Sequence, residues 1–426
     1  MRIASSDRIG AKRAGESSTM GDKPRHLLDG YKVLDFTHFV AGPTTTRLMA
    51  GMGAEIIKVE MAPHGDHARA FDYIRDGRSA FFVQQNRGKE SLCVDLRKPE
   101  GVALVKQLVP QVDVVVENFA PGVIGNIGLG YEVLKAINPA IVMCSISALG
   151  QTGPLAHDAG FDFIGQAYAG ITSLIGEAEG PPYMPMVAIG DVSTGAHAMG
   201  AIACALLYRE RTGEGQYIDV SLLDSYFHCQ TIGVQLYSAS KGAREMKASG
   251  LHHSLACPAG VFKGRKWWII ILAMTDKQWL GVCAAIGKPE LGTDSRYARA
   301  RDRSQHRLEI IRVIEDWLAA MPNDEASIEA LRSNRVPVAP ILSVREAMEH
   351  PHLIARGTVR TINDPILGEF KIPGFPLRFS GFPEELEFDA PMLGEHNAAV
   401  LERYLGFSAA RVAELETAGV LHRAPH

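Results

Sequence analysis

The chain has 426 residues, of which 46% are apolar and 22% are charged, and its formal net charge is −4. One hydrophobic core rarely serves more than about 300 residues, so we expect two domains. This composition is ordinary for a soluble globular protein. The small negative charge predicts no nucleic-acid partner. No apolar run reaches the ~18 residues of a membrane helix, so we expect a cytoplasmic protein that does not span a membrane.

Metal and disulfide chemistry have no support in the sequence. The six cysteines are scattered without a Cys-x-x-Cys pair, which argues against zinc and against a disulfide framework. No His-Glu-x-x-His motif or other cluster has ligand spacing, so we predict no metal site. The G-x-S-x-G nucleophile elbow and the phosphate-binding loop are also absent.

Residues 1–27 are polar, basic and rich in serine and glycine, without the apolar core of a secretory signal. We predict that they form a disordered leader. After them, strand and helix patterns alternate, which predicts βαβ units, a parallel sheet and an α/β fold. The expected strands cover 31–36, 54–60, 89–96, 112–119 and 140–147, and 217–224 is expected to be a strand that runs into a helix. The expected helices cover 42–53, 99–111, 131–138 and about 192–209.

The domain boundaries follow from changes in this pattern. Residues 28–225 are predicted to form the first part of a large Rossmann-like domain. Residues 226–344 combine strand patterns with amphipathic helices, which predicts a smaller α+β domain. The Pro-rich and then polar stretch 345–426 is expected to return to the large domain and complete it.

The Rossmann-like pattern lacks the dinucleotide fingerprint. Gly51 and Gly53 follow the first helix instead of preceding it. They cannot bring a pyrophosphate onto the helix N-terminus, so we predict no NAD site.

Asp191 stands at the start of a helix built from small residues, in "AIGDVSTGAHAMGAIACALL" (188–207). Its position fits a helix N-cap, where aspartate is favoured. Gly195 and Gly200 in the helix interior indicate that other backbone or a ligand approaches closely, because glycine is costly there by about 1 kcal/mol. A capping role and a nucleophilic role both remain open from these residues.

Several ordered segments together resemble the class III CoA-transferases, the CaiB/BaiF family, which includes formyl-CoA:oxalate CoA-transferase. The resemblance runs from about residue 28 to 401 and is weak in the small domain. It rests on "VLDFTHFVAGPTTTRLMAGMGAEIIKVE" (33–60), "DLRKPEG" (95–101), "VVENFAPGVIGNIGLGYEVLKAINPAIVMCSIS" (115–147), "GQTGPLAHDAGFDFIGQAYAG" (150–170), "GDVSTGAHAMGAIACALLYRERTGEGQYIDVSLLDS" (190–225), "HPHLIARG" (350–357) and "APMLGEHNAAVL" (390–401).

The resemblance implies that Asp191 is a covalent nucleophile. It would move CoA from an acyl-CoA thioester to a free carboxylic acid through aspartyl anhydride and aspartyl-CoA intermediates. Asp162 would be a second carboxylate that orients the acceptor acid or Asp191. No cofactor is implied, because CoA enters as the substrate thioester. The resemblance also implies a homodimer in which two ring-like chains interlock.

The resemblance also implies which residues of this chain bind CoA. The resemblance places His38, Val40, Ala41, Met61, Val94, Arg97, Asn118 and Phe119 against CoA. Arg97 would meet a phosphate, and Asn118 and Phe119 would lie on the adenine side. The family often has arginine where Met61 stands and a basic residue near Asn126. We therefore consider Lys58, Arg47 and Arg87 as replacement phosphate ligands.

Two alternatives remain open. Racemases of the family, which act on 2-methylacyl-CoA, carry histidine before the aspartate that matches Asp162, but this chain has Phe161, which cannot carry a proton. A noncatalytic CoA-binding protein is the other, and the complete Gly-Asp-x-x-x-Gly segment argues against it. Residues 249–260 do not match the glycine-rich loop of the formyl-CoA transferases, which argues against formate and oxalate as substrates.

Overall fold

The computed structural model describes residues 26–382, 386 and 388–424. The predicted leader, 1–27, therefore lies outside the described residues except for its last two. His26 is buried and stacks on Phe382 with ring centroids 4.6 Å apart. This contact places His26 in packed structure, so the prediction of a disordered leader is wrong at its C-terminal end.

Six parallel strands form the central sheet, in the order β5-β2-β1-β6-β7-β8. Their bounds are β1 Lys32–Asp35, β2 Glu55–Met61, β5 Lys89–Val94, β6 Val114–Glu117, β7 Val142–Ser147 and β8 Tyr217–Ser221. In chain order this is the 3-2-1-4-5-6 arrangement of a Rossmann sheet, with its switch point between β1 and β6. The predicted α/β fold with a parallel sheet is confirmed.

Neighbouring strand residues face opposite layers of helices, which explains the unbroken apolar runs. Val33 and Ile56 pack with helices α1 (Ala41–Gly51) and α7 (Ile189–Thr212). Leu34 and Ile57 pack on the other face. That face is covered by α3 (Pro99–Leu108), α5 (Tyr131–Ile137), α16 (Asn397–Leu405) and α17 (Ala409–Thr417). The short α2 (Ala80–Asn86) lies in the connection between β2 and β5, and the short α4 (Val123–Asn126) in that between β6 and β7.

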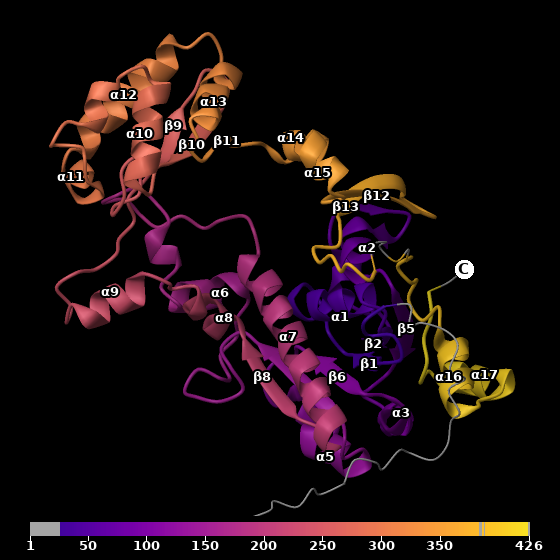
Figure 1. The fold of residues 1–426 in the computed structure, drawn as a ribbon. Helices are drawn as coiled ribbons and strands as arrows, with labels where there is room; N and C mark the ends of the chain where they lie inside the picture. Colours follow the sequence, from indigo (N-terminus) through magenta and orange to yellow (C-terminus); the bar gives the residue numbers. More distant parts are fainter. Residues whose placement is uncertain (1–25, 383–385, 387, 425–426) are drawn as a thin grey trace, which may run out of the picture.

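A second body with its own hydrophobic core spans about Cys257 to Val338. It contains the antiparallel sheet β11-β10-β9 and the helices around it, at the upper left of Figure 1. Its elements are β9 Ala259–Lys263, β10 Trp268–Leu272, α10 Asp276–Ala285, α11 Ala300–Gln305, α12 Arg307–Ala320, α13 Asp324–Ser333 and β11 Val338–Pro340. The expected boundary at 226 falls inside α8 (Leu222–His228), which packs on the large body, and α9 (Gly233–Ala239) follows.

The C-terminal segment runs back to the large body. It passes through α14 (Val344–Glu349), α15 (Pro351–Ala355) and the hairpin of β12 (Val359–Asp364) and β13 (Gly368–Pro373). Asn397 then accepts a hydrogen bond from the Cys93 N–H of β5 at 2.9 Å, and Leu421 forms a bridge with Val94. Segments far apart in sequence are thus joined at one sheet edge (Figure 1).

Helix α7 lies unusually close to α1. A Cβ added to Gly195 would lie 2.7 Å from the Ala41 carbonyl oxygen, and the Thr45 hydroxyl donates to the Gly195 carbonyl at 3.2 Å. The close approach inferred from Gly195 is therefore confirmed. At Gly200 no other backbone of the described residues comes close, because nothing lies within 4 Å of its added Cβ.

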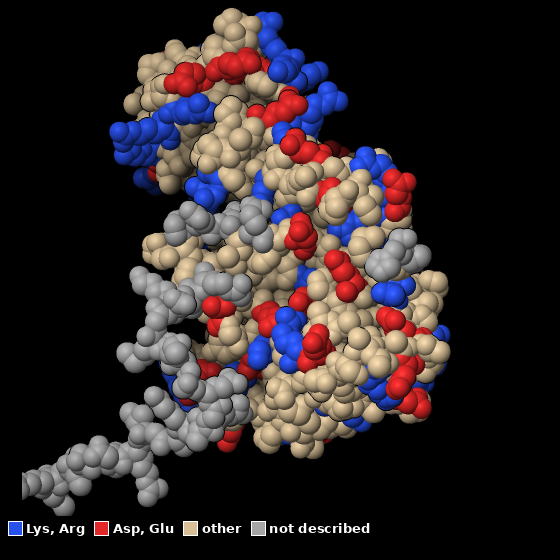
Figure 2. All heavy atoms as spheres, turned by 90° about the vertical axis from the view of Figure 1, so that its right-hand side faces the viewer, with Lys and Arg blue, Asp and Glu red and all other residues tan. Residues whose placement is uncertain are grey.

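The described residues contain no helix long and apolar enough to cross a bilayer. On the face shown in Figure 2, basic and acidic side chains are interspersed.

Candidate active site

A cleft of about 290 Å³ lies at the carboxyl ends of the neighbouring strands β1 and β6, from which the chain continues to opposite sides of the sheet. Ligands of open α/β sheets bind at this switch point. Six residues singled out from the sequence share its lining: His38, Val40, Ala41, Asn118, Phe119 and Asp191. Asp191 comes from the crossover between β7 and β8, so the tertiary structure brings distant segments to one site.

Asn118 joins the two loops of the switch point. Its Oδ1 accepts the His38 N–H at 2.8 Å, and its Nδ2 donates to the His38 carbonyl, also at 2.8 Å. The neighbouring Phe119 ring lies 5.2 Å from the His38 ring, centroid to centroid. Asn118 therefore fixes the backbone beside the cleft, in addition to any contact it makes with a ligand.

Phe39, which the sequence analysis did not single out, holds a strained conformation in the cleft wall. Its φ of 64° lies in the left-handed region, which costs a non-glycine residue about 1–3 kcal/mol. The Phe39 N–H donates to Asp66 Oδ1 at 3.1 Å, and the buried Lys58 ammonium pairs with Asp66 at 2.9 Å. The buried ion pair thereby anchors the Phe39 backbone beside the switch point.

Two further hollows continue from the cleft. The first, of about 250 Å³, shares His38 and Phe119 with the cleft and is also lined by Met61. The second, of about 590 Å³, shares Met61 and is lined by three cations, Arg97, Lys98 and Lys106, and by Asn126. Together they form a path from the carboxylate of Asp191 to a basic end, which suits an elongated ligand with phosphates at one end.

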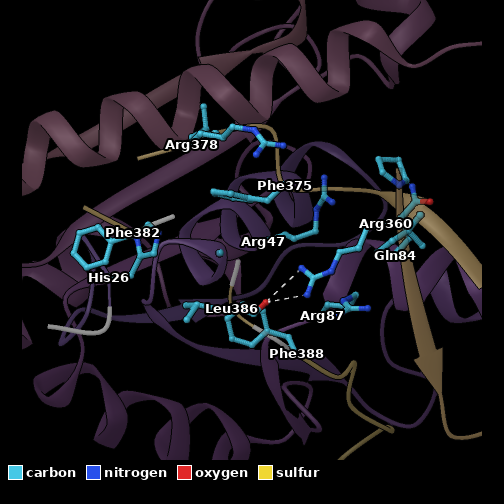
Figure 3. A pocket seen from close by; sticks show the side chains of 14 residues that line it. His26, Arg47, Gln84, Arg87, Arg360, Phe375, Arg378, Phe382, Leu386 and Phe388 are labelled. Carbon is cyan, nitrogen blue, oxygen red and sulfur yellow. Dashed lines mark hydrogen bonds between the residues drawn. The ribbon is translucent and has the colours of Figure 1, made fainter. Parts of the chain in front are cut away.

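Five of the sequence candidates line none of the three hollows: Asp162, Val94, Lys58, Arg47 and Arg87. Val94 is fully buried and lines none of the three hollows. Lys58 is buried in its ion pair with Asp66. Arg47 and Arg87 line a separate cavity of about 70 Å³ together with Arg360 and Arg378, as Figure 3 shows.

Asp191 is not the cap of its helix. Helix α7 begins at Ile189, its N-cap is Ala188, and no side chain of the helix caps it. Asp191 is the third residue of the first turn. The capping interpretation is therefore wrong, and the helix needs other partners for its first N–H groups.

Those partners come from outside the helix. The Asp191 N–H donates to Asp162 Oδ2 at 2.8 Å, and the Gly190 N–H donates to the Tyr226 hydroxyl at 2.9 Å. The N–H groups of Ile189 and Val192 bond to local carbonyls. All four of these N–H groups are therefore already paired and do not point freely into the cleft to stabilise an oxyanion. No motif in the sequence pointed to Tyr226, because its role depends on packing between helices.

The carboxylate of Asp191 accepts no hydrogen bond from any residue that the structure describes. Burial raises its pKa, and the nearby charge of Asp162 raises it further, to about 7. Both causes penalise the ionised form. At neutral pH a carboxyl group with this pKa is partly ionised, and its ionised form, without hydrogen bonds, is suited to nucleophilic attack.

Residues 28–397 match the model of CoA-transferase family III. The chain belongs to this family. It is 35% identical over 400 residues to succinyl-CoA:glutarate CoA-transferase of Mus musculus, covering 93% of this chain and 90% of the relative. It is 34% identical over 401 residues to succinyl-CoA–D-citramalate CoA-transferase of Chloroflexus aurantiacus, covering 94% and 99%.

The fold of this family III CoA-transferase is similar to that of a solved structure. The crystal structure of a CaiB/BaiF family protein from Brucella suis matches with a TM-score of 0.77 and 35% identity, covering 88% of this chain and 99% of that one. The resemblance deduced from the motifs is thereby confirmed, and the enzyme is a CoA-transferase. Among the described residues no group of histidine, cysteine, aspartate or glutamate is arranged to hold a metal ion.

The pKa of Asp191 predicts the pH dependence of the transferase. If the ionised form attacks, kcat/KM falls about tenfold per pH unit below pH 7 and levels off above it. Asp162→Asn keeps an acceptor for the Asp191 N–H and removes the like charge. The acidic limb should then move to lower pH, without reaching an ordinary aspartate value because burial remains. Steady-state rates from pH 5 to 9 measure this, and an unmoved limb would contradict it.

Proposed function

We propose that this transferase moves CoA from an acyl-CoA thioester to a free carboxylic acid, with Asp191 as the covalent nucleophile. The observation that carries the proposal is the Asp191 carboxylate, which faces the switch-point cleft and accepts no hydrogen bond from the described residues. The reaction needs no resident cofactor, because CoA arrives as part of the donor.

The reaction has four acyl-transfer steps, two that consume the donor thioester and two that form the product thioester. Asp191 attacks the donor thioester carbon, the C–S bond breaks, and an aspartyl anhydride forms with release of CoA thiolate. The thiolate then attacks the Asp191 carbonyl, giving aspartyl-CoA and the free donor acid. The acceptor carboxylate attacks aspartyl-CoA, which expels CoA thiolate and forms a second anhydride. The thiolate then attacks the acceptor carbonyl of that anhydride, which gives the product thioester and releases the Asp191 carboxylate. Each step exchanges one activated acyl bond for another, so no external energy source is needed.

The cleft suits an intermediate that water would destroy. Phe39, Phe161 and Leu149 are among the side chains that line it around Asp191. Apolar walls limit the access of water to the anhydride. Phe161 also occupies the position of the racemase histidine, so the racemase alternative lacks that base. The relatives named for CoA transfer do not favour it either.

The names of the relatives support a class of substrates. The mouse and Chloroflexus proteins are named for succinyl-CoA with glutarate or D-citramalate. We therefore propose the CoA thioester of a short dicarboxylic acid as donor and a second short dicarboxylic acid as acceptor. A panel of CoA donors against mono- and dicarboxylates tests this assignment.

We propose that CoA lies along the three connected hollows, with its thioester at Asp191 and its phosphates near Arg97, Lys98 and Lys106. The Arg97 side chain is 66% exposed and pairs with Asp95 at 2.8 Å, so it remains accessible to a phosphate.

A homodimer of interlocked ring-like chains is the proposed assembly. The C-terminal return to the large body supports a ring within each chain. Large apolar side chains stand exposed just before α7, with Met186 87% and Val187 61% exposed. Apolar surface of this kind is commonly covered by a partner.

Replacing Asp191 tests the nucleophile. Asp191→Asn keeps the shape of the side chain but makes a poor nucleophile, so transfer should fall by about three orders of magnitude or more, as should Asp191→Ala. Incubating the wild-type enzyme with acyl-CoA and hydroxylamine should convert Asp191 to a hydroxamate detectable by peptide mass spectrometry. Near-normal turnover by Asp191→Asn would end the proposal.

Replacing Arg97 tests the phosphate end. Arg97→Ala should raise KM for acyl-CoA about tenfold, the loss of one charge-assisted contact, and leave kcat nearly unchanged. Arg296→Ala is the matched control, because Arg296 likewise pairs with an aspartate on the surface but lies in the second body. An equal loss in kcat would place Arg97 in the chemistry instead.

Light scattering tests the assembly. Two interlocked chains cannot separate without unfolding, so the dimer mass should persist on dilution to micromolar concentration and below. A monomer mass under native conditions would refute the interlocked dimer.

A further inference from the structure

Tyr226 is seated against the first turn of the helix that carries the nucleophile. The residue is 3% exposed, and a Cβ added to Gly190 would lie 2.1 Å from its ring. Glycine is thus required at position 190 for the ring to pack there. In this position the Tyr226 hydroxyl makes hydrogen bonds with three groups.

The direction of the hydrogen bonds around this hydroxyl is fixed by counting protons. The hydroxyl accepts from the Gly190 N–H at 2.9 Å and from Gln166 Nε2 at 3.1 Å. A phenol has a single proton, and that proton goes to Asp162 Oδ1. The other oxygen of Asp162 accepts the Asp191 N–H at 2.8 Å. Asp162, which is 4% exposed, is therefore an acceptor at both oxygens, as an ionised carboxylate is.

We propose that Tyr226 is a positioning residue for the nucleophile: its hydroxyl donates to Asp162 and holds the negative charge there, so that Asp191, whose carboxylate accepts no hydrogen bond from the described residues, is the member of the pair that takes up a proton. This inference rests on the proposed function, because it takes Asp191 as the nucleophile. Two neighbouring buried carboxylates resist double ionisation, and the partner with more donors keeps the charge. Asp191, without donors, is then the member that gains and loses the proton.

Four titratable groups face Asp191 from the elements packed around it: His38, Asp158, Asp162 and Tyr226. Burial lowers the pKa of His38 to about 4, so its imidazole is neutral throughout the relevant range. The pKa of Tyr226 is raised above its ordinary value, by burial and by Asp162. Tyr226 therefore keeps its proton and acts only as a donor to Asp162.

Tyr226→Phe isolates the hydroxyl, because the ring can still pack on Gly190. Without this donor the negative charge beside Asp191 is no longer held in place on Asp162, and Asp191 becomes ionised at lower pH. The acidic limb of kcat/KM should move to lower pH, with kcat at the plateau about tenfold lower from the loss of one hydrogen bond and KM unchanged. A purely structural role would lower the rate by the same factor at every pH.

Two comparisons sharpen the test. Tyr208→Phe removes a tyrosine hydrogen bond to a carboxylate far from the cleft, at 3.1 Å to Glu214, and should change nothing. In the double variant with Asp162→Asn, Tyr226→Phe should produce no additional shift, because its effect passes through the charge of Asp162. Additive shifts, or an unmoved limb in Tyr226→Phe, would overturn the inference.

3-Fluorotyrosine at position 226 keeps the test decisive if Tyr226→Phe does not fold. Its hydroxyl is a stronger donor, so the charge on Asp162 is held more firmly and the acidic limb should move to higher pH. A shift in the other direction, or none, would overturn the inference. Failure of the proposed function looks different, because Asp191→Asn would then be active and no hydroxamate would form.

Discussion

The contact between Gly195 and the Ala41 carbonyl determines where the nucleophile lies. Only a residue without a side chain allows α7 to approach α1 this closely, since an added Cβ would lie 2.7 Å from that oxygen. The approach carries the first turn of α7 to the switch point between β1 and β6. Asp191 thereby meets the cleft residues His38 and Asn118, which precede it by 153 and 73 residues.

Around this contact, the backbone N–H groups at the start of α7 are hydrogen-bonded, whereas the carboxylate of Asp191 is not. Asp162 and Tyr226 take the N–H groups of Asp191 and Gly190, which stabilises the helix end in place of a cap. The same bonds leave the carboxylate of Asp191 without donors, so burial and the neighbouring charge bring its pKa to about 7. Stability of the helix and reactivity of the carboxylate therefore have one structural origin.

The parallel α/β architecture and the family could be predicted from the sequence alone. Apolar runs such as 31–36 and 112–119 alternate with helical patterns. The spacing of apolar residues follows directly from local backbone geometry and burial, so it can be recognised in the sequence. The ordered motifs also singled out Asp191 and five cleft residues, His38, Val40, Ala41, Asn118 and Phe119, which the structure brings together. The motifs identified these residues correctly because each motif is a local stretch of chain at the carboxyl end of a strand or the start of a helix.

The interactions between these groups could be seen only in the tertiary structure. It showed that Asp191 lies within the helix and does not cap it, and that Arg47 and Arg87 face a different cavity. It also revealed Tyr226, whose hydroxyl reaches Asp162 across 64 residues of sequence. Such contacts depend on how helices pack in three dimensions, and side-chain packing between distant elements leaves no periodic signal along the chain.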